Sequence, residues 1–398
     1  MPEIAEVARC VHFLRQHVVN RRIASVLTSG DDPIIYLTSK TGLDASKLVA
    51  SLQGKKVVAA KQQGKYFWLE IEKPPHLLLH LGMTGWIKFK GDESADYQQM
   101  SKNAKTDEDT LKDDENGDPA QSVLTPAEDW PPRFWKFILK MEDGREAAFV
   151  DPRRLGRVRL IDAPASQMRN TSPLKENGPD PVIDADMITP EWFKNTLQSK
   201  KVPVKSLLLD QAVLSGVGNW VADETLYHAR IHPETYCNTL AEKETTQLRE
   251  ALLDVCKTAC DVLGDSSRFP TDWLMIHRWS KAKNGKGSTK LPNGETLSFV
   301  TVGGRTSAFV AQRQKKSGAT AESRAGEKES TKGPVKIKAS KASSTKQNPE
   351  DDKVIVKTQD PRRSNAKRST RASASIVEDE PEEKSIGSAR KKRRVTSR

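Results

Sequence analysis

The chain has 398 residues, 36% of them hydrophobic, and its 65 Lys and Arg exceed its 53 Asp and Glu to give a formal net charge of +12. This length allows two ordinary domains together with unstructured segments, and the positive charge favours a polyanionic partner such as nucleic acid. No apolar stretch is long enough to cross a bilayer, so we expect no membrane partner.

Four cysteines are present, and none of them forms a Cys-x-x-Cys pair. They are Cys10, Cys237, Cys256 and Cys260. This spacing predicts reduced, mostly buried thiols in an intracellular protein and argues against a structural zinc site.

The segment from Met1 to Glu6 combines a proline with two carboxylates. Since Pro2 is small, we expect Met1 to be removed, which leaves a free secondary amine with Glu3 and Glu6 nearby. An apolar stripe at helical spacing follows, formed by Ile4, Val7, Ala8, Val11, Leu14 and Val18. Pro2 is suited to be the first helical residue, and the helix dipole disfavours protonation of an amine there. The segment is therefore either a simple helix start or a helix start that carries a nucleophile.

Short segments of strand character come next, joined by connections that contain glycine. They lie at 22–27, 57–60, 66–71, on both sides of 82–85, and at 134–141, 146–150 and 156–161. This pattern predicts a β-sandwich or barrel.

An acidic segment at 92–132 interrupts the strands. Residues 92–129 carry 12 Asp and Glu against 3 Lys and Arg and have almost no large apolar side chains. Such a composition predicts a disordered insertion in a surface loop. If the partner is DNA, this acidic segment either shields the surface that binds it, or it is a solvated insertion without effect on binding.

The second half changes to helical periodicity. Pro and Gly at 171–186 predict a linker, and Thr189 before Pro190 is a good helix start. Further helices are expected at 204–209, from Asn219 as N-cap, and at 242–263. Because strands and helices are segregated, the sequence predicts an α+β protein with two domains.

The end of the chain contains a hairpin pattern and a polar tail. Residues 296–302 and 306–312 flank Gly303-Gly304-Arg305, which predicts a β-hairpin. From Ser317 onward, 21 Lys and Arg accompany 12 Asp and Glu with few aromatics, which predicts a disordered basic tail. The cluster from Arg390 to Arg394 is typical of nuclear import, and non-specific phosphate binding is the competing interpretation.

Two loops have residue types suited to DNA. Gly216-Val217-Gly218-Asn219 at a helix start allows close approach of a phosphate, although an ordinary capped turn explains it as well. Arg153 and Leu155 in the Asp151–Gly156 segment pair a cation with an apolar wedge, which can fill the gap left by an extruded nucleotide. The alternative is a surface ion-pair cluster.

Three single side chains have two interpretations each. Met83 is either a second wedge or a core residue. Lys65, after Gly64 in a tight connection, either contacts DNA or points into water. Arg305 at the hairpin turn either reaches a groove or is a solvated loop residue.

Together these segments resemble the formamidopyrimidine-DNA glycosylase/endonuclease VIII family of base-excision repair enzymes, in the zincless type of plants and fungi. The resemblance covers Pro2 to about Arg313 and rests on motifs in the family's order. They are Pro2-Glu3 with Glu6, Gly64-Lys65-Tyr66, His80-Leu81-Gly82-Met83-Thr84-Gly85, Asp151-Pro152-Arg153-Arg154-Leu155-Gly156, and the run from Leu208 through Gly216-Val217-Gly218-Asn219 to Glu234.

The resemblance implies a catalytic β-sandwich domain with a flanking helix at 1–170, including the insertion at 92–132. A linker at 171–188, a helix–two-turn–helix domain at 189–294, a zincless finger hairpin at 295–313 and a disordered tail at 314–398 would follow. The expected partner is damaged double-stranded DNA in the cleft between the two domains, bound by a monomer in the nucleus. The tail would bind DNA or repair partners, and no metal or other cofactor is expected.

The resemblance also implies roles for individual residues. Pro2 would form a Schiff base with C1′ of the damaged nucleoside, Glu3 would transfer protons and Glu6 would support them. Lys65 would act at the lesion phosphate. Asn219 and Arg305 would hold the phosphates on either side of the flipped nucleotide. Met83, Arg153 and Leu155 would fill the space that this nucleotide leaves in the base stack.

Three features differ from the bacterial members. The hairpin has no cysteine, and Leu155 stands where those members have an aromatic wedge. The segment 275–295 also differs from the loop that covers a flipped 8-oxoguanine in those members. We therefore expect a bifunctional glycosylase/AP lyase that removes oxidised purines by β,δ-elimination, with formamidopyrimidine and hydantoin lesions as its main substrates and 8-oxoguanine as a weaker one. The alternatives are an enzyme for oxidised pyrimidines, similar to endonuclease VIII, or a non-catalytic DNA-binding protein.

Overall fold

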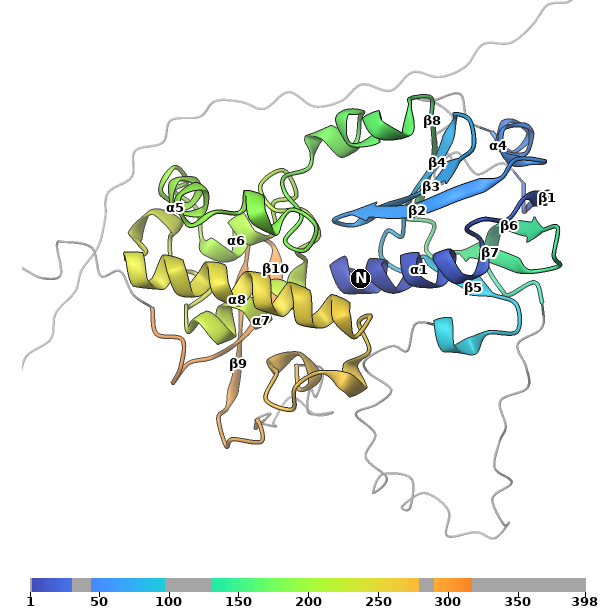
Figure 1. Cartoon of the computed structure of the whole chain (residues 1–398). Coiled ribbons are helices and arrows are strands. Elements are labelled where there is room, and N and C mark those ends of the chain that lie inside the picture. Colours follow the sequence, from blue (N-terminus) through green and yellow to red (C-terminus); the bar gives the residue numbers. More distant parts are fainter. Residues whose placement is uncertain (1, 31–43, 97–129, 279–289, 317–398) are drawn as a thin grey trace, which may run out of the picture. The chain divides into compact units, whose positions relative to one another are not determined.

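Two four-stranded antiparallel sheets build the first half of the protein (Figure 1). This computed structural model describes residues 2–30, 44–96, 130–278 and 290–316. The strand order is β1-β6-β7-β5 in one sheet and β2-β3-β4-β8 in the other. The strands are β1 Ile23–Thr28, β2 Val57–Gln63, β3 Tyr66–Ile71, β4 His76–His80, β5 Trp86–Phe89, β6 Trp135–Met141, β7 Glu146–Val150 and β8 Arg157–Ile161. The predicted β-sandwich is confirmed.

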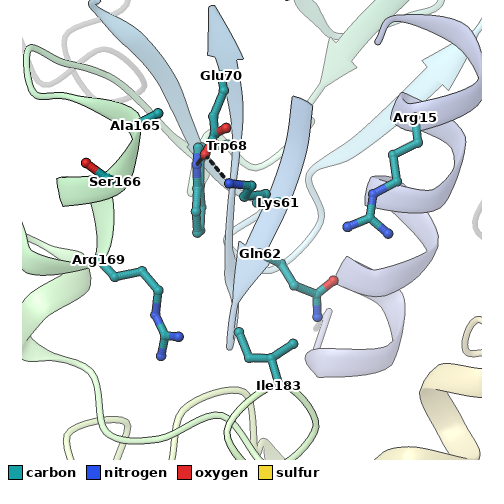
Figure 2. Close-up of a pocket in the computed structure, with 9 residues that line it drawn as sticks. All are labelled: Arg15, Lys61, Gln62, Trp68, Glu70, Ala165, Ser166, Arg169 and Ile183. Carbon is teal, nitrogen blue, oxygen red and sulfur yellow. Dashed lines mark hydrogen bonds and ion pairs between the residues drawn. The ribbon is translucent and has the colours of Figure 1, made fainter. Parts of the chain in front are cut away.

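The outer face of the β2-β3-β4-β8 sheet is covered by the segment that follows β8. Met168 and Leu174 of that segment pack on Trp68 of β3. A pocket of about 350 Å³ lies beside Trp68, and an ion pair of 2.9 Å joins Lys61 and Glu70 on its wall. Figure 2 shows the residues that line this pocket. The predicted linker at 171–188 is therefore part of a packed connection, which has three 3-10 turns at Ala165–Asn170, Leu174–Glu176 and Ala185–Met187.

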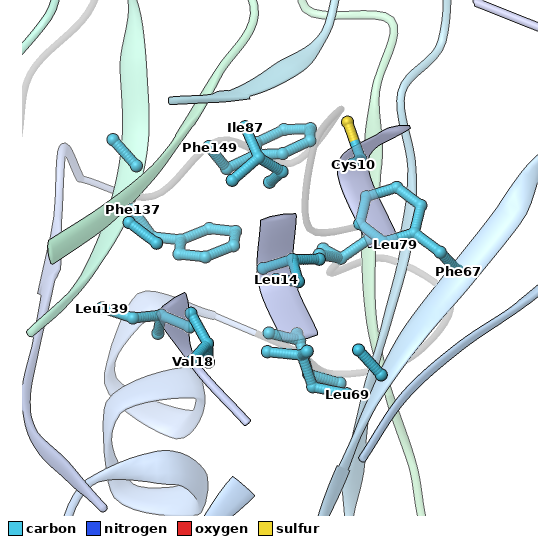
Figure 3. Packing of buried hydrophobic residues seen from close by; sticks show 14 of the residues in the cluster. Cys10, Leu14, Val18, Phe67, Leu69, Leu79, Ile87, Phe137, Leu139 and Phe149 are labelled. Carbon is cyan, nitrogen blue, oxygen red and sulfur yellow. The ribbon is translucent and has the colours of Figure 1, made fainter. Parts of the chain in front are cut away.

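Helix α1 (Ile4–His17) links two hydrophobic cores. Figure 3 shows Leu14 of α1 between Phe67 of one sheet and Phe137 of the other. At the opposite end of the helix, Ile4 and Ala5 belong to the core of the helical domain. The apolar stripe predicted from the sequence is thus divided between two domains, and the amino terminus is fixed where they meet.

The second half consists of helices and a hairpin. The helices are α5 Pro190–Gln198, α6 Val204–Leu208, α7 Asn219–Ala229 and α8 Glu242–Asp261, and the first half adds α4 Ala45–Leu52. Strands β9 (Leu297–Val302) and β10 (Arg305–Val310) pair across Gly303 and Gly304, whose φ angles of 58° and 72° suit the turn. A separate apolar cluster that includes Tyr227 and Leu297 joins the hairpin to α7. The predicted helical domain and the predicted hairpin are confirmed.

Several predicted boundaries need correction. Helix α1 begins at Ile4 with Glu3 as its N-cap, so Pro2 precedes the helix instead of being its first residue. Helix α7 has Gly218 as its N-cap and Asn219 as its first residue. The side chain of Asn219, which the sequence assigned to local capping, donates to the backbone of Thr306 instead.

The ends of the predicted disordered segments are structured. Residues 93–95 form a 3-10 turn, in which Ala95 is buried and its carbonyl accepts the indole N–H of Trp86. Gln314 is buried and bonds to the backbone at Ile231 and Val310. The remainder of the insertion, at 97–129, and of the tail, at 317–398, lies outside the described residues. Among the helices of the described ranges, none is long and apolar enough to span a bilayer.

Candidate functional site

The carboxylate of Glu3 lies at the amino-terminal end of α7. It is buried, Oε1 accepts the N–H of Trp220 at 3.0 Å and Oε2 accepts the N–H of Val221 at 3.1 Å. An anion is stabilised at a helix amino terminus by free N–H groups and by the helix dipole. The anion that the sequence predicted at this helix start was a phosphate. In the structure it is Glu3, which comes from the other domain.

The two glycines of the Gly216-Val217-Gly218 turn make this approach possible. A Cβ atom on Gly218 would lie 2.1 Å from Cδ of Glu3. The carbonyl of Gly216 accepts the N–H of Ile4 at 3.1 Å, and a Cβ atom there would lie 3.0 Å from the Ile4 side chain. These glycines therefore accommodate the amino-terminal segment of the protein.

Glu6 supports the same segment from one helical turn away. Its Oε2 accepts the backbone N–H of Glu3 at 2.9 Å, and the side chain is 1% exposed. Burial, with a smaller effect from the charge of Glu3, raises the pKa of Glu6 to about 7. Glu6 can therefore take up or release a proton near neutral pH, close to the backbone of the predicted proton-transfer residue.

The raised pKa of Glu6 predicts a pH-dependent stability. Between pH 4.5 and about 7 the folded protein retains a proton that the unfolded chain has lost. The free energy of unfolding should therefore fall across this range, relative to a Glu6→Gln variant, by up to about 3 kcal/mol. Urea unfolding at several pH values measures it. A Glu242→Gln variant, altered at an exposed site, should follow the wild type, and a pH-independent difference between wild type and Glu6→Gln would contradict the prediction.

Lys65 is positioned by the tight turn between β2 and β3. Gly64 has a φ of 58°, and its N–H donates to Oδ2 of the buried Asp180 at 2.7 Å. A Cβ atom on Gly64 would lie 2.7 Å from the backbone nitrogen of Gly216, so this turn contacts the loop before α7. Burial lowers the pKa of Lys65, Glu3 opposes that shift and Arg305 adds to it. Lys65, Glu3 and Arg305 are thus close enough to influence one another electrostatically.

Asn219 and Arg305 are connected through the hairpin. The Nδ2 group of Asn219 donates to the carbonyl of Thr306 at 3.0 Å, and Thr306 follows Arg305 directly. Arg305 is exposed at the start of β10, and a Cβ atom on Gly303 would lie 2.7 Å from Oγ of Ser206 on α6. The structure therefore holds the two predicted phosphate clamps as one unit.

A buried carboxylate that the sequence did not reveal fixes this unit. Asp223 on α7 pairs with Lys205 of α6 and with Arg278 at 2.6 Å, and it accepts the N–H of Ala308 on β10 at 3.0 Å. Lys205 also donates to the carbonyl of Asn219 at 2.9 Å. One carboxylate thus binds α6, α7 and the hairpin together. No local motif identifies Asp223, because its partners lie far from it in the sequence.

Replacing Asp223 by asparagine should destabilise the protein by about 3 kcal/mol, because it removes the buried counter-charge of the fully buried Lys205. Urea unfolding measures the change. Asp143→Asn is the matched control, since Asp143 pairs with Arg21 at an exposed site and its loss should matter far less. A fully stable Asp223→Asn variant would show that the hairpin is held by its apolar contacts alone.

Met83, Arg153 and Leu155 lie on two turns that share one carboxylate. Asp151 is fully buried. Its Oδ1 accepts a hydrogen bond from the hydroxyl of Thr84 at 2.8 Å, and its Oδ2 accepts one from the N–H of Gly156 at 2.6 Å. Met83 is half-buried and outside the core, Arg153 is exposed, and Leu155 is 36% exposed. The structure thus brings the three predicted gap-filling residues to neighbouring turns.

The ring of His80 connects these turns to Lys65. Its Nδ1 accepts the N–H of Gly82 at 3.0 Å, and its ring lies 4.9 Å from that of Tyr66, the residue after Lys65. Burial, together with the nearby charge of Lys65, lowers the pKa of His80 to about 4. The imidazole is therefore neutral near pH 7 and adds no positive charge near Lys65.

The described residues contain no group of three or more His, Cys, Asp or Glu side chains arranged to hold a metal ion. The four cysteines are free thiols.

Comparison with known proteins identifies two domains. Residues 1–158 match the formamidopyrimidine-DNA glycosylase N-terminal domain, and residues 178–271 match the formamidopyrimidine-DNA glycosylase H2TH domain. A formamidopyrimidine-DNA glycosylase of Arabidopsis thaliana is 34% identical over 322 residues, which cover 81% of this chain and 73% of the relative. One from Desulforamulus reducens is 27% identical and is covered over 99% of its length, with 79% of this chain aligned.

The fold also matches a solved structure. A formamidopyrimidine-DNA glycosylase of Lactococcus lactis, crystallised with DNA that contains an AP site, superposes with a TM-score of 0.58 at 22% identity. The match covers 79% of this chain and all of the other. At this identity the likeness confirms the arrangement of the sheets, helices and hairpin.

Proposed function

The chain belongs to the formamidopyrimidine-DNA glycosylase family, whose members are DNA glycosylase/AP lyase enzymes of base excision repair, and from this premise we propose that it removes oxidised purines through a Schiff base on Pro2. The proposed partner is damaged duplex DNA, and the proposed substrates are formamidopyrimidine and hydantoin lesions. The observation that carries the proposal is the contact between Glu3 and the start of α7. This contact joins the amino-terminal segment to the start of α7, where Asn219 is the first residue.

In the proposed reaction, removal of Met1 frees the secondary amine of Pro2, whose side chain is buried beside Glu3. The amine attacks C1′ of the damaged nucleoside, the bond to the base breaks, and the base leaves with a proton. The C1′–O4′ bond of the sugar then breaks as O4′ takes up a proton, and the resulting iminium acidifies C2′–H. Loss of this proton expels the 3′ phosphate, and a second elimination expels the 5′ phosphate.

Glu3 is the proposed proton acceptor and donor for these steps. Its two N–H contacts fix the orientation of the carboxylate, and each oxygen retains a further lone pair for a substrate proton. Glu6 supports it through the backbone N–H of Glu3. The proposed role of Lys65 is to bind the phosphate at the lesion. The charges of Glu3 and Arg305 both act on the ammonium group of Lys65.

The proposed binding surface has two parts. Asn219 and Arg305, joined through Thr306, would hold the phosphates on either side of the extruded nucleotide. Met83, Arg153 and Leu155, on the turns organised by Asp151, would fill the vacated stack.

A panel of duplexes, each with one defined lesion opposite each base, tests this assignment under single-turnover conditions. We expect fastest excision of ring-opened purines and hydantoins and a single-nucleotide gap with phosphate at both ends. Fastest excision of oxidised pyrimidines would instead indicate an enzyme similar to endonuclease VIII. Binding of damaged DNA without strand cleavage would indicate a non-catalytic DNA-binding protein.

We also propose that the protein acts in the nucleus, directed by the basic cluster Arg390 to Arg394, which lies outside the described residues. A fluorescent fusion should accumulate in the nucleus and lose that distribution when the cluster is replaced by glutamines. An unchanged distribution would contradict this proposal.

A further inference from the structure

Phe134, directly before β6, is an exposed aromatic residue in a strained conformation. Its side chain is 51% exposed and its φ is 62°, in the left-handed region. A bulky residue in this region is an outlier that persists only where its surroundings hold it. Glycine or asparagine would adopt this conformation more easily. Burial does not account for a phenylalanine here.

The guanidinium group of Arg133 lies over the ring, 5.0 Å from its centroid. A cation at this distance is attracted to the face of an aromatic ring. The two residues therefore present a flat apolar surface accompanied by a positive charge, which is suited to a nucleobase next to its phosphate.

The position of Phe134 links it to the turns that carry the gap-filling residues. The carbonyl of Phe134 accepts the N–H of Asp151 at 3.1 Å. The carboxylate of Asp151 in turn bonds to Thr84, next to Met83, and to Gly156, next to Leu155. A single buried residue thus organises three segments, each with an apolar side chain that is at least partly exposed.

We propose that Phe134 is a further DNA-contacting residue, which stacks on a base exposed when the damaged nucleotide leaves the helix, with Arg133 meeting the adjacent phosphate. This inference rests on the proposed function, because it requires a distorted duplex. It extends the predicted set of Met83, Arg153 and Leu155 by an aromatic side chain. Leu155 cannot provide one, and Phe134 is held beside it through Asp151.

The backbone strain provides a test that does not depend on damaging the fold. Phe134→Gly removes the ring and relieves the strain, so the variant should be at least as stable as the wild type. Its affinity for a duplex with a tetrahydrofuran abasic site should fall about tenfold, since stacking of a base on an aromatic side chain is lost. Affinity for undamaged duplex should change much less. Phe134→Tyr should retain the affinity of the wild type.

Fluorescence of 2-aminopurine, placed beside the abasic site, reports stacking directly. Wild type and Phe134→Tyr should quench it on binding, and Phe134→Gly should leave it bright. Val58→Ala, which shortens another exposed apolar side chain on β2, is the control and should behave as the wild type. Equal quenching and affinity in the Phe134→Gly variant would overturn the inference.

The same preparations separate this inference from the proposed function. If the wild type excises lesions and Phe134→Gly binds the abasic duplex as tightly as the wild type, the inference fails and the function stands. If the wild type binds the abasic duplex but excises none of the lesions, the proposed chemistry fails, and a lower affinity of Phe134→Gly still supports the stacking contact.

Discussion

Replacing Glu3 by glutamine should reduce single-turnover base excision by about a thousandfold, within the range that a positioned general acid–base contributes. The amide cannot take up the proton that the carboxylate accepts. Its NH₂ group would also face one of the two N–H donors of Trp220 and Val221, so the side chain would lose its defined orientation.

Excision and folding must be measured together for this variant. A buried N–H that loses its acceptor costs about 1–3 kcal/mol, so urea unfolding should show a folded protein of reduced stability. Glu242→Gln is the control, because Glu242 is an exposed carboxylate that pairs with Lys194. If Glu3→Gln excised bases as fast as the wild type, Glu3 would be only a structural group at the start of α7.

Replacing Gly218 by alanine should reduce excision by about a hundredfold without any change to a catalytic side chain. The added Cβ would lie 2.1 Å from Cδ and 2.4 Å from Oε1 of Glu3, so the carboxylate must leave the end of α7. A displacement of about 1 Å at a reacting group can cost this much. The φ of Gly218 is −126°, which alanine adopts without strain, so the effect comes from the contact alone.

Gly144→Ala serves as the control for this substitution. Gly144 lies in the turn between β6 and β7 with a φ of 84° and open space around its Cα, so alanine there is strained but touches nothing. It should lower stability by about 1 kcal/mol and leave excision unchanged. Full activity of Gly218→Ala would show that the position of the Glu3 carboxylate does not control the reaction.

Local patterns predicted much of this protein because they depend on neighbours in the sequence. The stripe through Val7, Val11 and Leu14 follows from helical spacing, and the hairpin around Gly303 and Gly304 follows from the conformations that its turn requires. The segregation of strand patterns from helix patterns along the chain predicted the two domains.

The contacts between distant segments could not be predicted in this way. Glu3 and Trp220 are 217 positions apart, so no local pattern distinguishes a carboxylate from a phosphate at the start of α7. Asp180 lies in a segment rich in proline and glycine that resembles a linker, yet it is buried and bonds to Gly64. Phe134 precedes a strand and fits an ordinary strand pattern, and only the structure shows its exposure and its φ.

Borohydride reduction tests the central claim most directly. The protein without Met1, mixed with a duplex that carries a formamidopyrimidine lesion, should yield a covalent complex whose cross-linked peptide begins at Pro2. The form that retains Met1 has no free amine at Pro2 and should yield none at that position. A complex on Lys65, or equal trapping by the two forms, would contradict the assignment of Pro2 as the nucleophile.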